Sequence, residues 1–307
     1  MILSKLARIA DALPRLLQID RRVDEIKMNQ GRLLTQMQDP NPAKPLWQHE
    51  FKVFSQWGED GIIQFLVNHL DIANRTFIEF GVEDFAESNC RFLLMKDNWH
   101  GFVLDGSERH MSRLKSSYFY WQHQLSCKAS FITRENVAAL LEASGFDKEV
   151  GILSVDIDGV DYHVLDALSE WRPSILIVEY NDAFGYKRPV TVPYDPAFVR
   201  SKKHFSNQYW GANLPAFCHL GTQRQYALVG TNSVGSNAFF VRCDLLNDHV
   251  RQVSESSCIR QASFRDSRNA AGQLTFLSGS ARALAIAEMP VIDVVTGESL
   301  FVGNLDA

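Results

Sequence analysis

The sequence predicts an α/β protein built on a seven-stranded, doubly wound sheet, with a helical extension of coiled-coil character at its N-terminus. After residue 46, short apolar runs alternate with helical patterns, which is typical of a parallel sheet covered by helices. Two later apolar runs are separated only by the turn-rich stretch "TNSVGS", which indicates an antiparallel pair. Residues 1–38 instead repeat apolar side chains in steps of three and four.

Composition narrows the class of protein. The chain has 307 residues, 46% of them hydrophobic, which allows one large domain or two ordinary ones. A formal net charge of -5 argues against a nucleic-acid binder. The five cysteines are scattered and form no CxxC, so neither a disulfide framework nor a zinc site is indicated. We therefore expect a cytoplasmic protein.

The N-terminal extension, residues 1–38, reads as an amphipathic helix that forms a homo-oligomer or docks on a partner. Its apolar runs are too short for a signal peptide or a membrane span. Pro14 is expected either to start a second helix or to kink a single one. Seven basic against four acidic residues in 1–35 leave peripheral contact with the inner face of a membrane as an alternative. The helical seam comprises Ile2, Leu6, Ile9, Leu13, Leu16, Ile19, Val23, Ile26, Leu33 and Met37, with Gln30 filling one position.

A linker with three prolines, residues 39–45, separates this helix from the α/β domain, residues 46–247. Five strands are predicted in parallel units, and two more form a hairpin. An extension, residues 248–307, ends in "VIDVVTGESLFVG", which reads as a terminal strand or hairpin. The predicted strands lie within residues 76–82, 101–107, 127–133, 151–158, 174–181, 225–230 and 237–243, with helices at 87–96, 134–144 and 160–171 between them.

Polar residues follow the ends of four of these strands, where ligands bind in doubly wound sheets. They are Glu79, Asp105, Asp156, Asp158, Glu179 and Asn181. Each acid alone could instead cap a helix or close a turn. A carboxylate that closes the second strand can accept both hydroxyls of a ribose, which predicts a nucleoside-bearing ligand. The first turn has one glycine, Gly81, rather than GxGxxG, so a pyrophosphate would find little support. S-adenosylmethionine (SAM), which carries no phosphate, fits this pattern.

Six blocks of sequence together resemble the FkbM-type class I SAM-dependent methyltransferases: "FSQWGEDGIIQFL", "FIEFGVEDFAESNCRFLL", "GFVLDGSE", "ILSVDIDGVDYHVLDAL", "ILIVEYN" and "LVGTNSVGSNAFFVR". The resemblance spans residues 51–245 and implies a Rossmann-like methyltransferase sheet and an O-methyltransferase acting on a sugar or glycoconjugate. It also implies that Glu79, Gly81 and Asn89 form the first cofactor motif and that Asp105 binds the ribose. Glu83 and Ser107 are also expected to bind the cofactor, Ser107 from the second turn. Glu83 stands where many methyltransferases have glycine.

The acidic motif after the fourth strand is the expected reaction centre. Methyl transfer to a hydroxyl needs a base, which contributes about 10²- to 10⁴-fold. Asp156 or Asp158 can act as this base. His163 either takes part as a base or substrate contact or has a structural role. Asp156, Asp158 and Asp161 could instead hold Mg²⁺, which acidifies a bound hydroxyl.

We assign the substrate to aromatic and polar residues after the fifth strand. These residues are His204, Tyr209, Trp210, Glu179 and Asn181, and the alternative for the aromatic ones is that they are ordinary core.

Two other functions stay open. The string "DID" also fits the DxD motif of a metal-dependent glycosyltransferase, in which Asp156 and Asp158 would hold a divalent ion on a nucleotide sugar. The chain could also be a noncatalytic scaffold assembled by its N-terminal helix.

Overall fold

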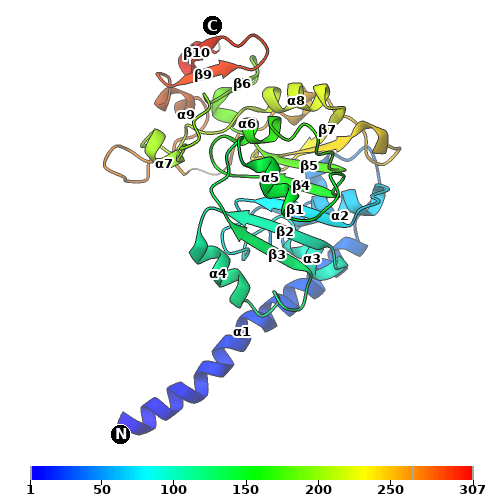
Figure 1. Ribbon diagram of the computed structural model, residues 1–307, viewed down its shortest axis with the longest axis vertical. Helices are drawn as coiled ribbons and strands as arrows, with labels where there is room; N and C mark the ends of the chain where they lie inside the picture. The colour runs from blue at the N-terminus through cyan, green and yellow to red at the C-terminus, as the bar shows by residue number, and fades with distance from the viewer. Residues whose placement is uncertain (1, 264–265, 306–307) are drawn as a thin grey trace.

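A seven-stranded mixed sheet forms the centre of the protein (Figure 1). The computed structural model describes residues 2–263 and 266–305, with side chains from residue 19 onward. The strand order is β3-β2-β1-β4-β5-β8-β7. The first five strands are parallel, and β8 runs antiparallel to both β5 and β7. The strands are β1 (Thr76–Phe80), β2 (His100–Asp105), β3 (Leu125–Ala129), β4 (Ile152–Val155), β5 (Ile175–Glu179), β7 (Tyr226–Thr231) and β8 (Asn237–Arg242).

This arrangement confirms the predicted doubly wound sheet with a terminal hairpin, the Rossmann-like methyltransferase fold. Successive residues of a strand point to opposite faces: Phe77 packs in one core cluster and Ile78 in the other. The helices on the Phe77 face are α2 (Glu59–His69), α3 (Arg91–Asp97) and α4 (Glu108–Ser116). Those on the Ile78 face are α5 (Val137–Glu142), α6 (Asp161–Asp166) and α8 (Leu214–Gln223). Short 3₁₀ turns are η1 (Leu46–His49), η2 (Asp182–Phe184), η3 (Cys243–Leu245), η4 (Glu255–Cys258) and η5 (Val302–Asn304).

The helices are shorter than the sequence pattern predicts. Helix α3 begins at Arg91 rather than near residue 87, because the Glu79 carboxylate accepts hydrogen bonds from the Ser88 hydroxyl and the amides of Asn89 and Cys90. These bonds hold the preceding chain in a loop. That loop lines the pocket described below.

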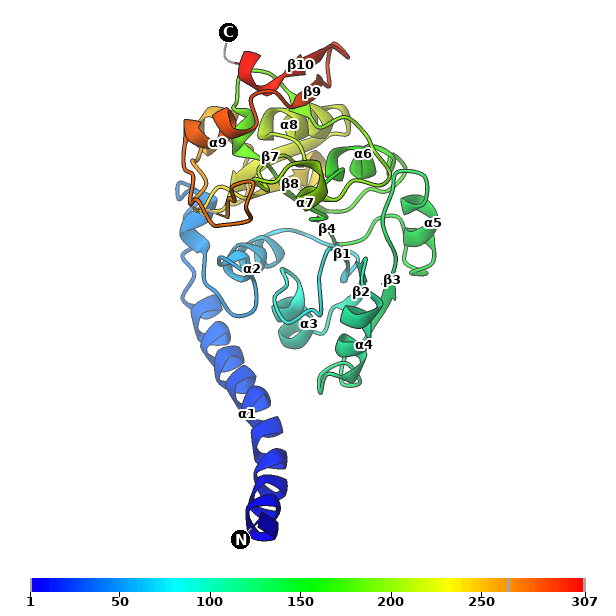
Figure 2. The same ribbon diagram turned by 90° about the vertical axis from the view of Figure 1, so that its left-hand side faces the viewer.

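The N-terminal helix α1 (Ile2–Gln36) is one continuous helix, so the alternative in which a second helix begins at Pro14 is wrong. Its C-terminal half lies against α2 and α3, and its N-terminal half projects from the body of the protein (Figure 2). Among the described residues, no helix is both long and apolar enough to cross a membrane.

The C-terminal extension adds a second, small sheet at the end of the molecule opposite the N-terminus (Figure 1). Strands β9 (Pro290–Asp293) and β10 (Ser299–Phe301) form the predicted hairpin. β9 also pairs with β6 (Val190–Thr191), which lies between β5 and α8 in the chain. The buried guanidinium of Arg282, on the short helix α9 (Ser280–Ala285), pairs with Asp182 and donates to Gln208. The extension is thereby joined to the segment that carries α7 (Arg200–Lys203).

Candidate functional site

A pocket of about 760 Å³ opens at the carboxyl ends of β1, β2, β4 and β5. Its position is the switch point between β1 and β4, where chain connections diverge to the two halves of the sheet and leave a crevice. The predicted residues that line it are Glu79, Gly81, Glu83, Asn89, Asp105, Asp156, Asp158 and Glu179. The fold therefore gathers the polar ends of four strands into one cavity.

Glu79, near the end of β1, shapes the loop beside the pocket. The side chain is buried, and burial raises the pKa of its carboxyl group. Its oxygens accept from the Asn89 amide at 2.8 Å and the Ser88 hydroxyl at 2.7 Å. The Asn89 side-chain amide in turn donates to the Ser154 hydroxyl at 3.1 Å. Glu79 thus holds the loop of residues 81–89 beside the pocket.

Gly81 allows this loop to touch the chain that follows β4. Its φ angle is +72°, in the left-handed region that favours glycine. A Cβ atom at this position would lie 1.6 Å from the carbonyl oxygen of Asp156. Glycine is therefore required here, and the close approach brings the two halves of the pocket together.

Asp105, the last residue of β2, accepts hydrogen bonds from two turns, the one after β1 and the one after β2. Its Oδ2 accepts from the Glu83 amide at 2.9 Å, and Glu83 itself has a positive φ of 47°. Its Oδ1 accepts from the Ser107 amide at 2.8 Å and lies 3.1 Å from His110 Nδ1. The Ser107 hydroxyl caps α4 by accepting from the His110 amide. Since each carboxylate oxygen has two lone pairs, Oδ2 can still accept a hydrogen bond from a ligand.

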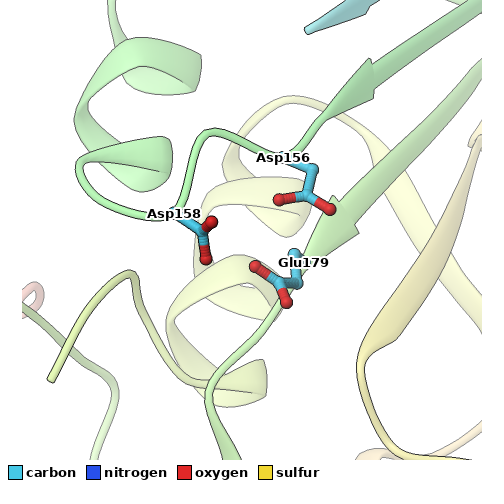
Figure 3. A group of neighbouring side chains, drawn as sticks. All are labelled: Asp156, Asp158 and Glu179. Carbon is cyan, nitrogen blue, oxygen red and sulfur yellow. The ribbon is translucent and has the colours of Figure 1, made fainter. Parts of the chain in front are cut away.

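Three carboxylates converge on the other side of the pocket (Figure 3). One oxygen each of Asp156, Asp158 and Glu179 lies within 4.8 Å of the others. Val155 of β4 pairs with Val178 of β5, so Asp156 and Glu179 follow side by side on neighbouring parallel strands. Asp158 turns back toward them through a positive φ of 55°.

Burial strongly affects these acids. It raises the pKa values of Asp156 and Glu179 well above their usual range, and repulsion between the neighbouring carboxylates adds to the effect. Oε2 of Glu179 is buried without a hydrogen-bond partner in the described structure. Such a set of oxygens is suited to binding a cation or sharing a proton.

Arg200, which the sequence pattern did not indicate, supplies a positive charge beside the three carboxylates. Its Nη1 donates to Asp158 Oδ1 at 2.5 Å, and its Nε donates to the Asn207 carbonyl at 2.7 Å. The guanidinium lies 5.0 Å from the ring centroid of Trp210. Arg200 is on α7, 42 residues beyond Asp158, and no local motif marks it.

Two residues predicted at the reaction centre lie outside the pocket lining. Both carboxylate oxygens of Asp161 accept backbone amides, from Ile157 at 2.8 Å and Gly159 at 2.9 Å, and burial raises its pKa to about 6. Asp161 is thus not grouped with the other carboxylates but holds the loop that presents Asp158. The His163 Nε2 lies 2.8 Å from the Val192 carbonyl oxygen, and burial lowers its pKa.

Of the residues assigned to the substrate, only Glu179 lines the pocket. Glu179 belongs to the carboxylate cluster. Tyr209 and Trp210 are buried, and the His204 ring bonds to the Ser206 hydroxyl. The Asn181 side chain is buried and donates to two backbone carbonyls. The aromatic side chains that do line the pocket are Trp57, Phe80, Phe131 and Phe198.

Trp57 reaches the pocket because two buried acids fold the loop before α2. Asp60 Oδ2 accepts from the amides of residues 53, 54 and 55. Glu59 Oε2 accepts from the amides of Trp57 and Gly58 at 3.0 Å each. The block "FSQWGEDG" contains all of these residues except residue 53, but its alternation of polar and apolar types does not reveal which side chains face the cavity.

Neither a protein family model nor a curated protein sequence matches the chain. Among solved structures, the chain is similar to an O-methyltransferase from Bacillus cereus in complex with S-adenosylhomocysteine (SAH). The identity is 12% and the TM-score 0.40, over 70% of this chain and 88% of that one. It is also similar to an O-methyltransferase family protein from Burkholderia thailandensis, at 11% identity and a TM-score of 0.37, over 60% and 57%.

A third match is the CurJ carbon methyltransferase, at 10% identity and a TM-score of 0.39, over 59% of this chain and 52% of that one. The chain thus spans about half the length of CurJ. The assignment of fold rests on the strand order given above.

Proposed function

We propose that the protein is a SAM-dependent methyltransferase of the FkbM type. The observation that carries the proposal is the pocket at the β1/β4 switch point, with Asp105 closing β2 beside the loop held by Glu79. Asp105 would accept the ribose hydroxyls. The Gly81–Asn89 loop would surround the methionine end, because a cofactor without phosphates does not need a glycine-rich cradle.

The carboxylate cluster gives this pocket a means to activate an acceptor. In O-methylation, the acceptor oxygen forms a bond to the methyl carbon, the sulfur–carbon bond breaks, and the hydroxyl proton leaves. SAH and the methyl ether are the products. An ionised carboxylate of Asp156, Asp158 or Glu179 would take the proton. The positive charge of Arg200, which pairs with Asp158, would favour that ionised form.

The same three carboxylates fit a divalent cation. Hard oxygen ligands suit Mg²⁺, and the unpartnered, buried Oε2 of Glu179 needs either a proton or a cation. Asp156, Asp158 and Glu179 would hold the ion, which when bound would lower the pKa of a coordinated hydroxyl.

We further propose a sugar or glycoconjugate as the acceptor. The sequence blocks that resemble the FkbM type support this choice, and the carboxylates suit the vicinal hydroxyls of a sugar. Trp57 and Phe198 could cover the apolar face of such a ring. The five free cysteines favour a reducing compartment, so we place the enzyme in the cytoplasm.

Calorimetric titration with SAH tests the cofactor. We expect binding by the wild type and a loss of at least tenfold in affinity for Asp105→Ala. The control is His219→Ala, a half-buried residue on α8 outside the pocket lining, which should change the affinity little. Unchanged affinity in Asp105→Ala would remove Asp105 from the site. Binding of a nucleotide sugar instead of SAH would favour the glycosyltransferase.

Measuring methyl transfer from labelled SAM then tests whether the carboxylate cluster takes part in the reaction. Asp156→Asn should abolish methyl transfer to a confirmed sugar acceptor while SAH still binds, the pattern of a lost transition-state interaction. Chelator should abolish activity only if the cation is needed. Binding of neither SAH nor a nucleotide sugar would favour the noncatalytic scaffold.

A further inference from the structure

Helix α1 uses one face to dock on the α/β domain. Asp24 pairs with Arg91 at 2.5 Å and accepts from the Tyr118 hydroxyl at 2.9 Å. Met28 is buried, and one further turn along the helix a Cβ at Gly31 would lie 2.6 Å from the Phe92 ring. In a heptad that places Val23 at position a, Asp24 and Gly31 occupy b and Met28 occupies f.

The opposite face of α1 carries an apolar stripe without a partner in the described structure. Its five apolar members are between 43% and 78% exposed. They occupy the a and d positions of the same heptad, the two positions that form the seam of a coiled coil. The stripe comprises Ile19, Val23, Ile26, Leu33 and Met37, with Gln30 at an a position between them.

The a positions of the same heptad stay apolar in the part of α1 that projects from the body (Figures 1 and 2), whereas the d positions there are Lys5 and Ala12. Residues 2, 9 and 16 of the sequence fall at a positions and are Ile, Ile and Leu. A helix with no tertiary partner is marginal in water, because little offsets the entropy of ordering its backbone. We propose that two copies of the chain pair through α1 as a parallel, in-register coiled coil.

The size of the stripe suits a second copy. Burying one large apolar side chain removes roughly 60–120 Å² of surface from water. Eight large apolar side chains occupy a and d positions between residues 2 and 37, so each helix would bury roughly 500–1,000 Å² at the area per side chain given above. A stable protein interface buries about 800 Å² per partner.

Gln30 selects the parallel, in-register arrangement. A polar residue at an a position specifies register, because its amide must find a partner inside the seam. In register, each Gln30 faces the Gln30 amide of the second copy, and both are satisfied. In an antiparallel pair, a positions face d positions, which are Ile19, Ile26 and Leu33 in this region, so the amide would be buried against apolar side chains.

Light scattering of the full-length protein tests the oligomer. The wild type should have twice the chain mass of 34.8 kDa. Ile26→Glu with Leu33→Glu should give a monomer, since both side chains are exposed in one copy and the fold should survive. Arg32→Glu, exposed at a c position, changes the net charge by the same two units and should remain dimeric.

Thermal unfolding should show that both variants stay folded. A monomeric wild type, a trimeric mass, or a dimeric Ile26→Glu/Leu33→Glu variant would overturn the proposal. So would a monomeric wild type that binds anionic phosphatidylserine vesicles, because the stripe would then be a membrane face.

Disulfide trapping tests the orientation. In a Cys243→Ser background, Ile26→Cys should form an intermolecular disulfide under mild oxidation, because paired d positions lie within disulfide range in a parallel, in-register pair. Arg32→Cys, away from the seam, should not. A dimer that never forms the Ile26→Cys bridge would overturn the parallel arrangement.

Discussion

Removing the carboxylate of Asp24 should cost far more stability than its place on a terminal helix suggests. Its partner Arg91 is buried between two aromatic rings, with its guanidinium 4.0 Å from the Phe54 centroid and 4.3 Å from that of Phe119. The side chains of Arg91 and Asp24 are only 7% and 12% exposed. Asp24→Ala therefore leaves a buried cation without its carboxylate.

Breaking a buried ion pair in this way costs about 3–5 kcal/mol. Urea unfolding followed by far-UV circular dichroism measures the loss. With a slope of about 3 kcal/mol per M, the midpoint should fall by about 1–1.7 M. Replacing both partners, in Asp24→Leu with Arg91→Met, should recover most of the loss, because no charge is left buried.

Two results would refute this reasoning. One is a midpoint within about 0.2 M of the wild type for Asp24→Ala, which at that slope is less than about 1 kcal/mol. The other is a double variant no more stable than Asp24→Ala. A matched exposed control is Glu25→Ala, whose pair with Arg21 lies at the surface and should contribute less than about 1 kcal/mol.

Two further predictions concern the pocket walls. Gly81→Ala should abolish SAH binding, because its Cβ would overlap the Asp156 carbonyl oxygen and push the loop of residues 81–89 away. The control is Gly145→Ala, which has a similar φ but open space around it. Equal SAH affinities of the two variants, measured by calorimetry, would contradict the argument. Burial raises the pKa of Asp60 to about 6. The proton that the folded state holds therefore stabilises it fully below about pH 4, and this contribution is lost as the pH rises through 6. Between pH 4 and 7 the unfolding free energy of the wild type should fall relative to Asp60→Asn by on the order of 3 kcal/mol, and parallel pH profiles would exclude this role.

The sequence predicted the sheet, and it predicted that Glu79, Gly81 and Asp105 lie at one edge of it, for a local reason. Apolar runs of strand length mark β1 to β5, and in a parallel sheet their carboxyl ends must share one edge. Glu79, Gly81 and Asp105 could therefore be placed together without coordinates. The heptad pattern likewise placed the apolar stripe on α1, because helical periodicity is a property of the chain itself.

The tertiary structure alone decided which side chains meet. Glu179 joins Asp156 because β4 and β5 are neighbours in register, and Arg200 reaches Asp158 from a helix far along the chain. Asp161 follows the same motif, yet backbone amides occupy both of its oxygens.

Asp24 on α1 shows the same contrast between what the sequence predicts and what only the tertiary structure decides. By sequence it is one more polar residue on an amphipathic helix, and only its contact with Arg91, 67 residues later, turns it into a docking residue. Periodicity determines which residues share a face of an element. What each face contacts depends on long-range packing, which no local pattern specifies.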